Sequence, residues 1–132
     1  MKFFTIAELC KSTTADRLGI NNRCRQEHVT ALTALVDNVL DPLREWWGKP
    51  ITVNSGYRCP ELNAAVKGSK TSQHMVGEAA DIDTGDRQQN KLLFEYIRKT
   101  LPYDQLIDES NFAWVHVSYR ADGNNRMQVL KL

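Results

Sequence analysis

The chain has 132 residues, the size of one folded domain, and we expect residues 1–132 to form a single unit. Hydrophobic residues make up 42% of the chain and charged residues 25%, which is typical of a soluble globular protein and excludes extensive disorder. The 17 basic and 16 acidic residues leave a formal net charge of +1. Such a chain has no large positive field to attract nucleic acid, and we expect a monomer without a nucleic-acid partner.

The N-terminal segment predicts a short helix and not an export signal. Thr5 and Glu8 have capping-box spacing, in which each side chain satisfies a free backbone N–H, so we expect a helix over about 6–12. Glu8 and Lys11 interrupt the apolar run before it reaches the length of a signal peptide, and no later segment approaches the length of a membrane span. We therefore expect a protein made in the cytoplasm without a recognisable signal peptide and without membrane insertion.

A long amphipathic helix is expected over 23–47. Its apolar side chains recur at spacings of three and four residues, which places them on one helix face: Val29, Leu32, Leu35, Val36, Val39, Leu40, Leu43 and Trp47. Pro42 suits a restart of the helix, because proline is tolerated in a first helical turn, and Gly48 suits its end.

Strands dominate the rest of the chain. Alternating and β-branched residues predict strands over 51–55 and 79–84, and a helix over 60–67 lies between them. Asp86 suits the N-cap of a further helix that extends to about Thr100. The final third predicts a meander of three strands, at 104–109, 114–119 and 127–132. Helices early and adjacent strands late favour an α+β fold, with N-terminal helices packed on a mainly antiparallel sheet.

Three cysteines, Cys10, Cys24 and Cys59, cannot all pair within one chain, and none has CxxC spacing. No spacing supports metal binding by these residues. We interpret them as reduced thiols, as expected of a protein made in the cytoplasm.

Strand parity brings a carboxylate and a histidine together. Successive side chains of a strand alternate between its two faces. In ADID, Ala80 and Ile82 must face the core, so Asp81 points to the opposite face. In WVHVS the two valines must face the core, which leaves His116 on the polar face. If the two strands share a sheet, Asp81 and His116 converge on one point.

A second histidine can reach the same point. His74 precedes Asp81 by seven residues, with Gly77 between them to let the chain turn back. His74, Asp81 and His116 are then the ligand set of an open catalytic zinc site, with a fourth position left for water. Each residue also has a plainer interpretation, as a surface histidine or a turn-capping carboxylate, and parity alone leaves both interpretations open.

Two motifs resemble one family. SxHxxGxAxD at 72–81, followed by WVHVS, resembles the M15 peptidases, the zinc D-Ala-D-Ala carboxypeptidase family, whose fold is shared with Hedgehog signalling domains. ITVNSGYR at 51–58 resembles the other signature of that family, and the resemblance covers roughly 43–120. It implies a Hedgehog/DD-peptidase fold, Zn²⁺ bound by the three residues above, and the stem peptide of bacterial peptidoglycan as substrate. The site of action would then be the cell wall.

The resemblance also implies catalytic roles for Arg58 and Glu109. Arg58 follows SGY and is similar to the family arginine that contacts substrate and stabilises the developing oxyanion. Some family members carry an acidic residue three positions before the last histidine ligand, where this chain has Ala113. Glu109, seven positions before His116 as in the similar arrangement of Hedgehog domains, is therefore the expected general base. Its plainer interpretation is a solvated residue at a strand end.

Ser72 and Trp114 are the expected substrate-binding residues beside Arg58. Ser72 is similar to the family serine that binds a substrate carboxylate, and it could equally only shape its loop. Trp114 shares the predicted strand face of His116 and would wall the cleft, unless it serves ordinary packing.

Several activities fit the same ligand set. A D,D-carboxypeptidase, a D,D-dipeptidase and an L-Ala-D-Glu endopeptidase would share it, and the short chain resembles phage-type or prophage-encoded lysis enzymes. The alternative from another class is a non-catalytic, zinc-containing module that binds peptidoglycan or a peptide, which Ala113 leaves open.

Overall fold

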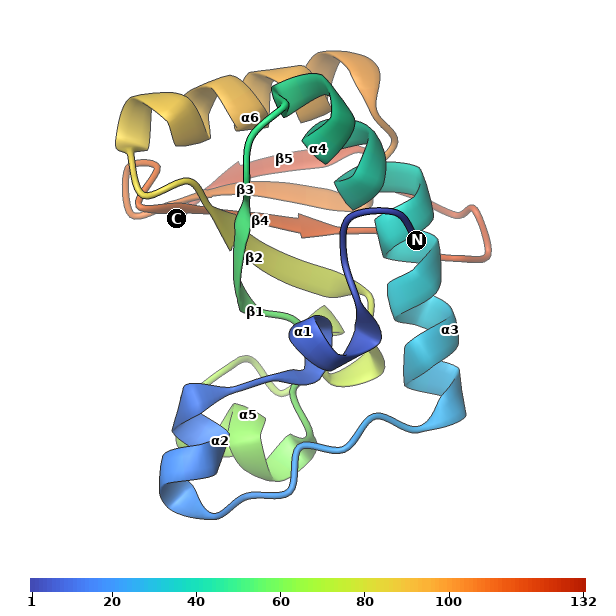
Figure 1. Cartoon of the computed structure of the whole chain (residues 1–132), viewed down its shortest axis with the longest axis vertical. Helices are drawn as coiled ribbons and strands as arrows, with labels where there is room; N and C mark the ends of the chain where they lie inside the picture. Colours follow the sequence, from blue (N-terminus) through green and yellow to red (C-terminus); the bar gives the residue numbers. More distant parts are fainter.

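The computed structural model describes residues 1–132 and combines a helical N-terminal half with a single sheet (Figure 1). The helical elements are α1 (Ile6–Cys10), α2 (Thr13–Leu18), α3 (Gln26–Leu35), η1 (Val36–Leu40), α4 (Asp41–Trp47), α5 (Pro60–Ala65), η2 (Gln73–Val76) and α6 (Arg87–Thr100). The strands are β1 (Thr52–Ser55), β2 (Ala79–Asp83), β3 (Gln105–Glu109), β4 (Trp114–Ser118) and β5 (Gln128–Lys131). The predicted α+β class is confirmed.

The sheet has the strand order β1-β2-β4-β3-β5. The pairs β1–β2, β2–β4 and β3–β4 are antiparallel, which confirms a mainly antiparallel sheet. The predicted meander is wrong in its last step, because β5 runs parallel to β3. The backbone N–H of Arg126 donates to Asp104 at 2.9 Å and that of Met127 to Tyr103 at 3.2 Å, so the chain returns to the start of β3 and does not pair with β4 as a hairpin.

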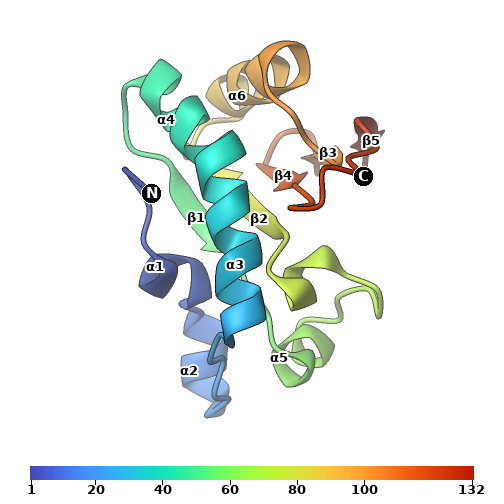
Figure 2. The ribbon, with the colours of Figure 1, turned by 90° about the vertical axis from the view of Figure 1, so that its right-hand side faces the viewer.

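The elements α3, η1 and α4 follow one another without a break and form one helical column (Figure 2). The column begins at Gln26, three residues later than predicted, and ends at Gly48, whose φ of 72° suits glycine. Its middle is a π-helical turn in which the backbone N–H of Asp41 donates to Val36. Pro42 has no N–H to donate, and a widened turn just before it accommodates the proline ring. No helix of the chain combines the length and the apolar character needed to cross a membrane.

The core lies between this helical column, α6 and one face of the sheet. Its column residues are fully buried and match the predicted apolar face: Leu32, Leu35, Val36, Val39, Leu40 and Leu43. The strands contribute Ala80, Ile82, Leu106, Val115 and Val117, all fully buried, and α6 adds Leu93 and Ile97. Because these strand residues alternate with Asp81 and His116, the opposite face of the sheet carries the polar side chains.

The N-terminal segment folds back on itself through a disulfide. Cys10 at the end of α1 pairs with Cys24, with their Cα atoms 6.5 Å apart, so the prediction of three reduced thiols is wrong for these two. The helix α2, which was not predicted, turns the chain back between them, and its N-cap Ser12 accepts from the backbone N–H of Ala15 at 3.1 Å. Cys59 is a free thiol.

Cys24→Ser should lower the free energy of unfolding by about 3 kcal/mol, because a bridge between residues 14 positions apart restricts the unfolded chain. Urea unfolding in the presence and absence of a reductant measures the change. Cys59→Ser is the matched control, since serine keeps an acceptor for the Leu62 N–H that Cys59 caps. Equal unfolding free energies for the oxidised and reduced wild type would contradict a stabilising bridge.

Candidate metal and substrate site

His74, Asp81 and His116 meet on the polar face of the sheet. Their candidate ligand atoms all lie within 4.8 Å of one another. Asp81 Oδ1 is 3.3 Å from His74 Nε2 and 3.0 Å from His116 Nδ1. Asp81 and His116 are direct partners in the β2–β4 register, as strand parity required. The structure therefore brings the three predicted ligands together.

His74 is held in η2 by its neighbours. The N-cap Ser72 accepts from the His74 backbone N–H at 3.2 Å, and Gly77 ends the turn with a φ of 78°. A Cβ at Gly77 would lie 2.7 Å from the carbonyl oxygen of His28, so only glycine fits there. His74 Nδ1 lies 2.7 Å from the Gly56 carbonyl, which orients the buried ring and leaves Nε2 facing Asp81.

The donor set suits zinc. Burial alone would raise the pKa of Asp81, but hydrogen bonds with His116 and His74 outweigh burial and hold that pKa well below its usual range. Asp81 is therefore an ionised oxygen donor between two imidazole nitrogens. Two histidines and one carboxylate are a common ligand set of catalytic zinc sites.

The three residues lie in an open cleft of about 730 Å³. Its lining includes every residue predicted from the sequence to belong to the site: Arg58, Ser72, His74, Asp81, Glu109, Trp114 and His116. Lys67, Arg120 and Arg126 also line it, and none of these three was predicted.

Glu109 lies at the end of β3 on the face that carries His116. Ile107 pairs with His116 and Glu109 pairs with Trp114, so these four side chains share one face of the sheet. Burial, and then the charge of Asp81, raise the pKa of Glu109. A carboxylate with a raised pKa accepts and releases a proton closer to neutral pH than an ordinary one.

The turn after Glu109 spans residues 110–113, between β3 and β4. Ser110, Asn111 and Phe112 have φ values of 51°, 56° and 60°, a run of left-handed residues that needs support. Asn90, buried in α6, donates to the Phe112 carbonyl at 2.9 Å and to that of Ala113 at 3.3 Å. The α6 helix thus fixes the turn that follows Glu109.

Arg58 is partly buried beside the ligand cluster. Its terminal amino group donates to Ser72 Oγ at 3.2 Å, and its backbone N–H donates to the His74 carbonyl at 3.0 Å. Burial lowers the pKa of the guanidinium, and the charge of Asp81 works against that effect. Its Nε is buried without a hydrogen-bond partner, which is unusual for a buried donor.

Asn22 holds the segment around Arg58 from both sides. Its amide donates to the carbonyls of Tyr57 and Cys10, each at 2.9 Å, and accepts from the Cys59 N–H at 2.7 Å. Asn22 lies within the loop closed by the disulfide, so the N-terminal segment positions Arg58. No sequence pattern points to this contact, because Asn22 and Cys59 are 37 residues apart.

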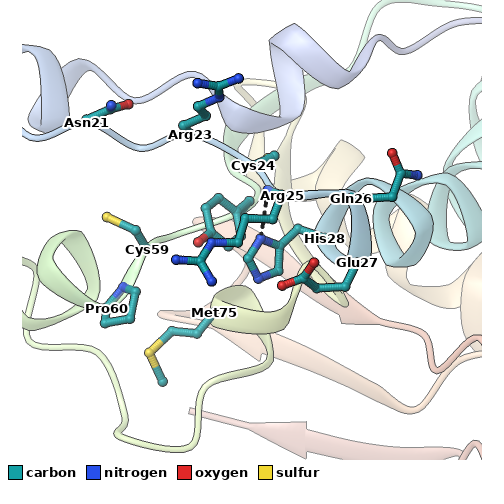
Figure 3. A pocket seen from close by; sticks show the side chains of 11 residues that line it. Asn21, Arg23, Cys24, Arg25, Gln26, Glu27, His28, Cys59, Pro60 and Met75 are labelled. Carbon is teal, nitrogen blue, oxygen red and sulfur yellow. Dashed lines mark hydrogen bonds between the residues drawn. The ribbon is translucent and has the colours of Figure 1, made fainter.

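A second cavity, of about 740 Å³, includes Tyr57, His28 and Met75 in its lining (Figure 3). His28 stacks on Tyr57 with ring centroids 4.3 Å apart, and its Nδ1 accepts from the backbone N–H of Arg25 at 3.1 Å. The candidate metal-binding group of the chain lies in the first cavity and not in this one. The stack instead supports the segment that carries Arg58.

Asp104 is a fully buried carboxylate behind the cleft. Arg126 donates to it through Nε at 3.0 Å and through a terminal amino group at 2.7 Å. Arg120 Nε lies 3.3 Å away, and the side chain of Gln73, the residue before His74, donates at 2.9 Å. Burial alone would raise the pKa of Asp104, but its bonds with Arg126 outweigh burial and lower that pKa to about 2.

Asp104→Asn should lower the free energy of unfolding at pH 7 by about 2 kcal/mol, because the pKa falls from 3.8 to about 2 on folding. The stabilisation is complete above the unfolded pKa and is lost as the pH falls toward 2. Urea unfolding of the wild type and the variant at pH 7 and at pH 3 measures the difference in unfolding free energy at each pH. Asp122→Asn, an exposed change in the β4–β5 loop that carries Arg120 and Arg126, is the control, and a pH-independent loss for Asp104→Asn would contradict the charge interaction.

An α+β protein with two histidines and a carboxylate at the floor of an open cleft has the arrangement of a metal-dependent hydrolase. The model of the family described as Peptidase M15 matches residues 2–118. The chain belongs to the peptidase M15 family, as the sequence motifs predicted. A zinc D-Ala-D-Ala carboxypeptidase of Streptomyces albus G is 38% identical over 76 residues. The match covers 50% of this chain but only 30% of that relative.

Proposed function

We propose that the protein is a zinc-dependent peptidase that hydrolyses the stem peptide of bacterial peptidoglycan. One observation carries the proposal: the ligand atoms of His74, Asp81 and His116 lie within 4.8 Å of one another in a cleft that Arg58 and Glu109 also line. Membership of the peptidase M15 family supports the reaction class, and the name of the Streptomyces albus G relative supports zinc and the D-Ala-D-Ala substrate.

His74 and His116 would hold the zinc ion through the nitrogens that face Asp81, and Asp81 through its carboxylate. When bound, zinc acts as a Lewis acid toward a peptide carbonyl and toward water. The protein supplies the orientation, since the Gly56 carbonyl and the β2–β4 register fix the ligand side chains before any metal binds.

Glu109 is the proposed general base. It takes the proton from the attacking water and passes it to the leaving amine, as hydrolysis of a peptide bond requires. Its place on the face of His116 puts it in the cleft beside the proposed zinc ligands. Ala113, where some family members carry an acid, has no group that can do this.

Arg58 and Ser72 are proposed to bind the substrate. A guanidinium can hold a carboxylate through two hydrogen bonds, and the Ser72 hydroxyl already contacts the Arg58 amino group. Fixed positive charge at Arg58 also favours the oxyanion that forms during hydrolysis. Trp114, opposite Glu109 in the β3–β4 pair, would form one side of the substrate cleft.

We also propose that the protein acts at the cell wall as a monomeric D,D-carboxypeptidase or endopeptidase of the lysis type. The disulfide between Cys10 and Cys24 supports a site of action outside the reducing cytoplasm. A non-catalytic, zinc-containing binding module is the second candidate, and Ala113 is the observation that favours it.

His116→Ala should abolish tight zinc binding, because it removes one of three protein ligands. The wild type should bind about one zinc per chain. Loss of a residue that only hydrogen-bonds to a metal ligand lowers metal affinity by up to roughly 100-fold. Loss of the ligand His116 should lower zinc affinity by more than that. Metal analysis after dialysis and calorimetric titration measure both. His28→Ala is the matched control, since His28 lies outside the ligand cluster, and equal zinc loss in both variants would contradict the assignment.

Glu109→Gln should retain zinc and lower kcat by roughly 100-fold to 10,000-fold, the usual contribution of a general base. Digestion of defined muropeptides followed by mass spectrometry measures the rate and identifies the bond that is cleaved. Full activity of the variant would exclude Glu109 as the base. A zinc-loaded wild type that binds peptidoglycan and cleaves no muropeptide would establish the binding module instead.

A further inference from the structure

Two arginines flank the metal-ligand cluster from opposite sides. Arg58 follows β1, and Arg120 lies two residues beyond the end of β4. The strands β1 and β4 both border β2 and end near its first residues, so Arg58 and Arg120 leave the same end of the sheet, one on the β1 side of β2 and the other on its β4 side. Both arginines line the cleft.

Arg120 is positioned by a buried acid that does not neutralise it. Asp104 offers one negative charge to two guanidinium groups, and Arg126 makes two side-chain hydrogen bonds to it. Arg120 meets Asp104 through Nε alone, at 3.3 Å, and its side chain is 35% exposed. Its terminal amino groups are therefore free to hold a carboxylate from the cleft.

The charges of the cleft favour an acidic ligand. Four basic side chains line it: Arg58, Lys67, Arg120 and Arg126. Three carboxylates oppose them, because Asp81 and Glu109 also line the cleft and Asp104 pairs with Arg120 and Arg126. Asp81 is already engaged by the two histidines. One basic charge therefore remains in excess, which favours an anionic ligand in the cleft.

We propose that Arg120, held by Asp104, binds a second carboxylate of the substrate, on the far side of the scissile bond from the carboxylate at Arg58. The inference rests on the proposed function and names the substrate class: an acidic peptide with a free C-terminus and a side-chain carboxylate upstream of the cleaved bond. Arg120 is four residues beyond His116, on the order of 13 Å of extended chain, so the second carboxylate lies within about three residues of that bond.

The test compares two pentapeptides that end in D-Ala-D-Ala. Their third residue carries a side-chain carboxylate that is free in one peptide and amidated in the other. Calorimetry measures the Kd of each peptide for the full, zinc-loaded chain in a Glu109→Gln background that suppresses turnover. The acid peptide should bind about tenfold more tightly, the effect of one charge-assisted bidentate contact. Arg120→Gln should reduce this ratio to about one.

Arg98→Gln is the matched control, because Arg98 pairs with Glu95 on α6, outside the cleft, and its loss should leave the ratio unchanged. Equal Kd values for the two peptides, no binding of either, or a preference that survives Arg120→Gln would overturn the inference. Cleavage by the wild type separates the two proposals. If both peptides are cleaved at equal efficiency, the Arg120 subsite alone fails. If the acid peptide is preferred in binding but neither is cleaved, the subsite stands and the peptidase proposal fails.

Discussion

The register between β2 and β4 is the constraint on which the whole site depends. It places Asp81 directly opposite His116, and a slip of one residue would turn one of the two side chains toward the core. The register is fixed by burial, because Ile82 and Val115 pair with each other and are fully buried. The apolar contacts that stabilise the sheet therefore also set the distance between two candidate metal ligands.

This coupling explains which features could be predicted from the sequence. A period of two predicts which side chains share a face, so it places Asp81 and His116 away from the core, and the resemblance to the M15 peptidases assigns them as metal ligands. The parallel pairing of β5 could not be found this way, since it depends on Arg126 reaching the buried Asp104 across 22 residues. The pairing of Cys10 with Cys24 likewise depends on the turn made by an unpredicted helix and not on any cysteine spacing.

Two side-chain amides position the backbone around the two proposed catalytic side chains. Asn22 holds the backbone on both sides of Arg58, and Asn90 holds the turn that follows Glu109. A buried amide satisfied by backbone partners is stable without a net charge. The buried carboxylate of Asp108 also supports that turn, because it accepts from the Phe112 N–H at 2.6 Å.

The two carboxylates of the cleft differ because their partners differ. Asp81 lies between two histidines whose hydrogen bonds outweigh its burial, so it is held ionised and suited to be a ligand. Glu109 is raised in pKa by burial and by the charge of Asp81, effects that the histidines only partly offset, and it is suited to carry a proton. Environments that separate the pKa values of neighbouring acids in this way assign them different chemical roles. Asp104 is a third acid with a role of its own. It is buried behind the cleft and pairs with both Arg126 and Arg120, so its single negative charge cannot neutralise both guanidinium groups. The remaining positive charge favours the acidic peptide proposed for the Arg120 subsite.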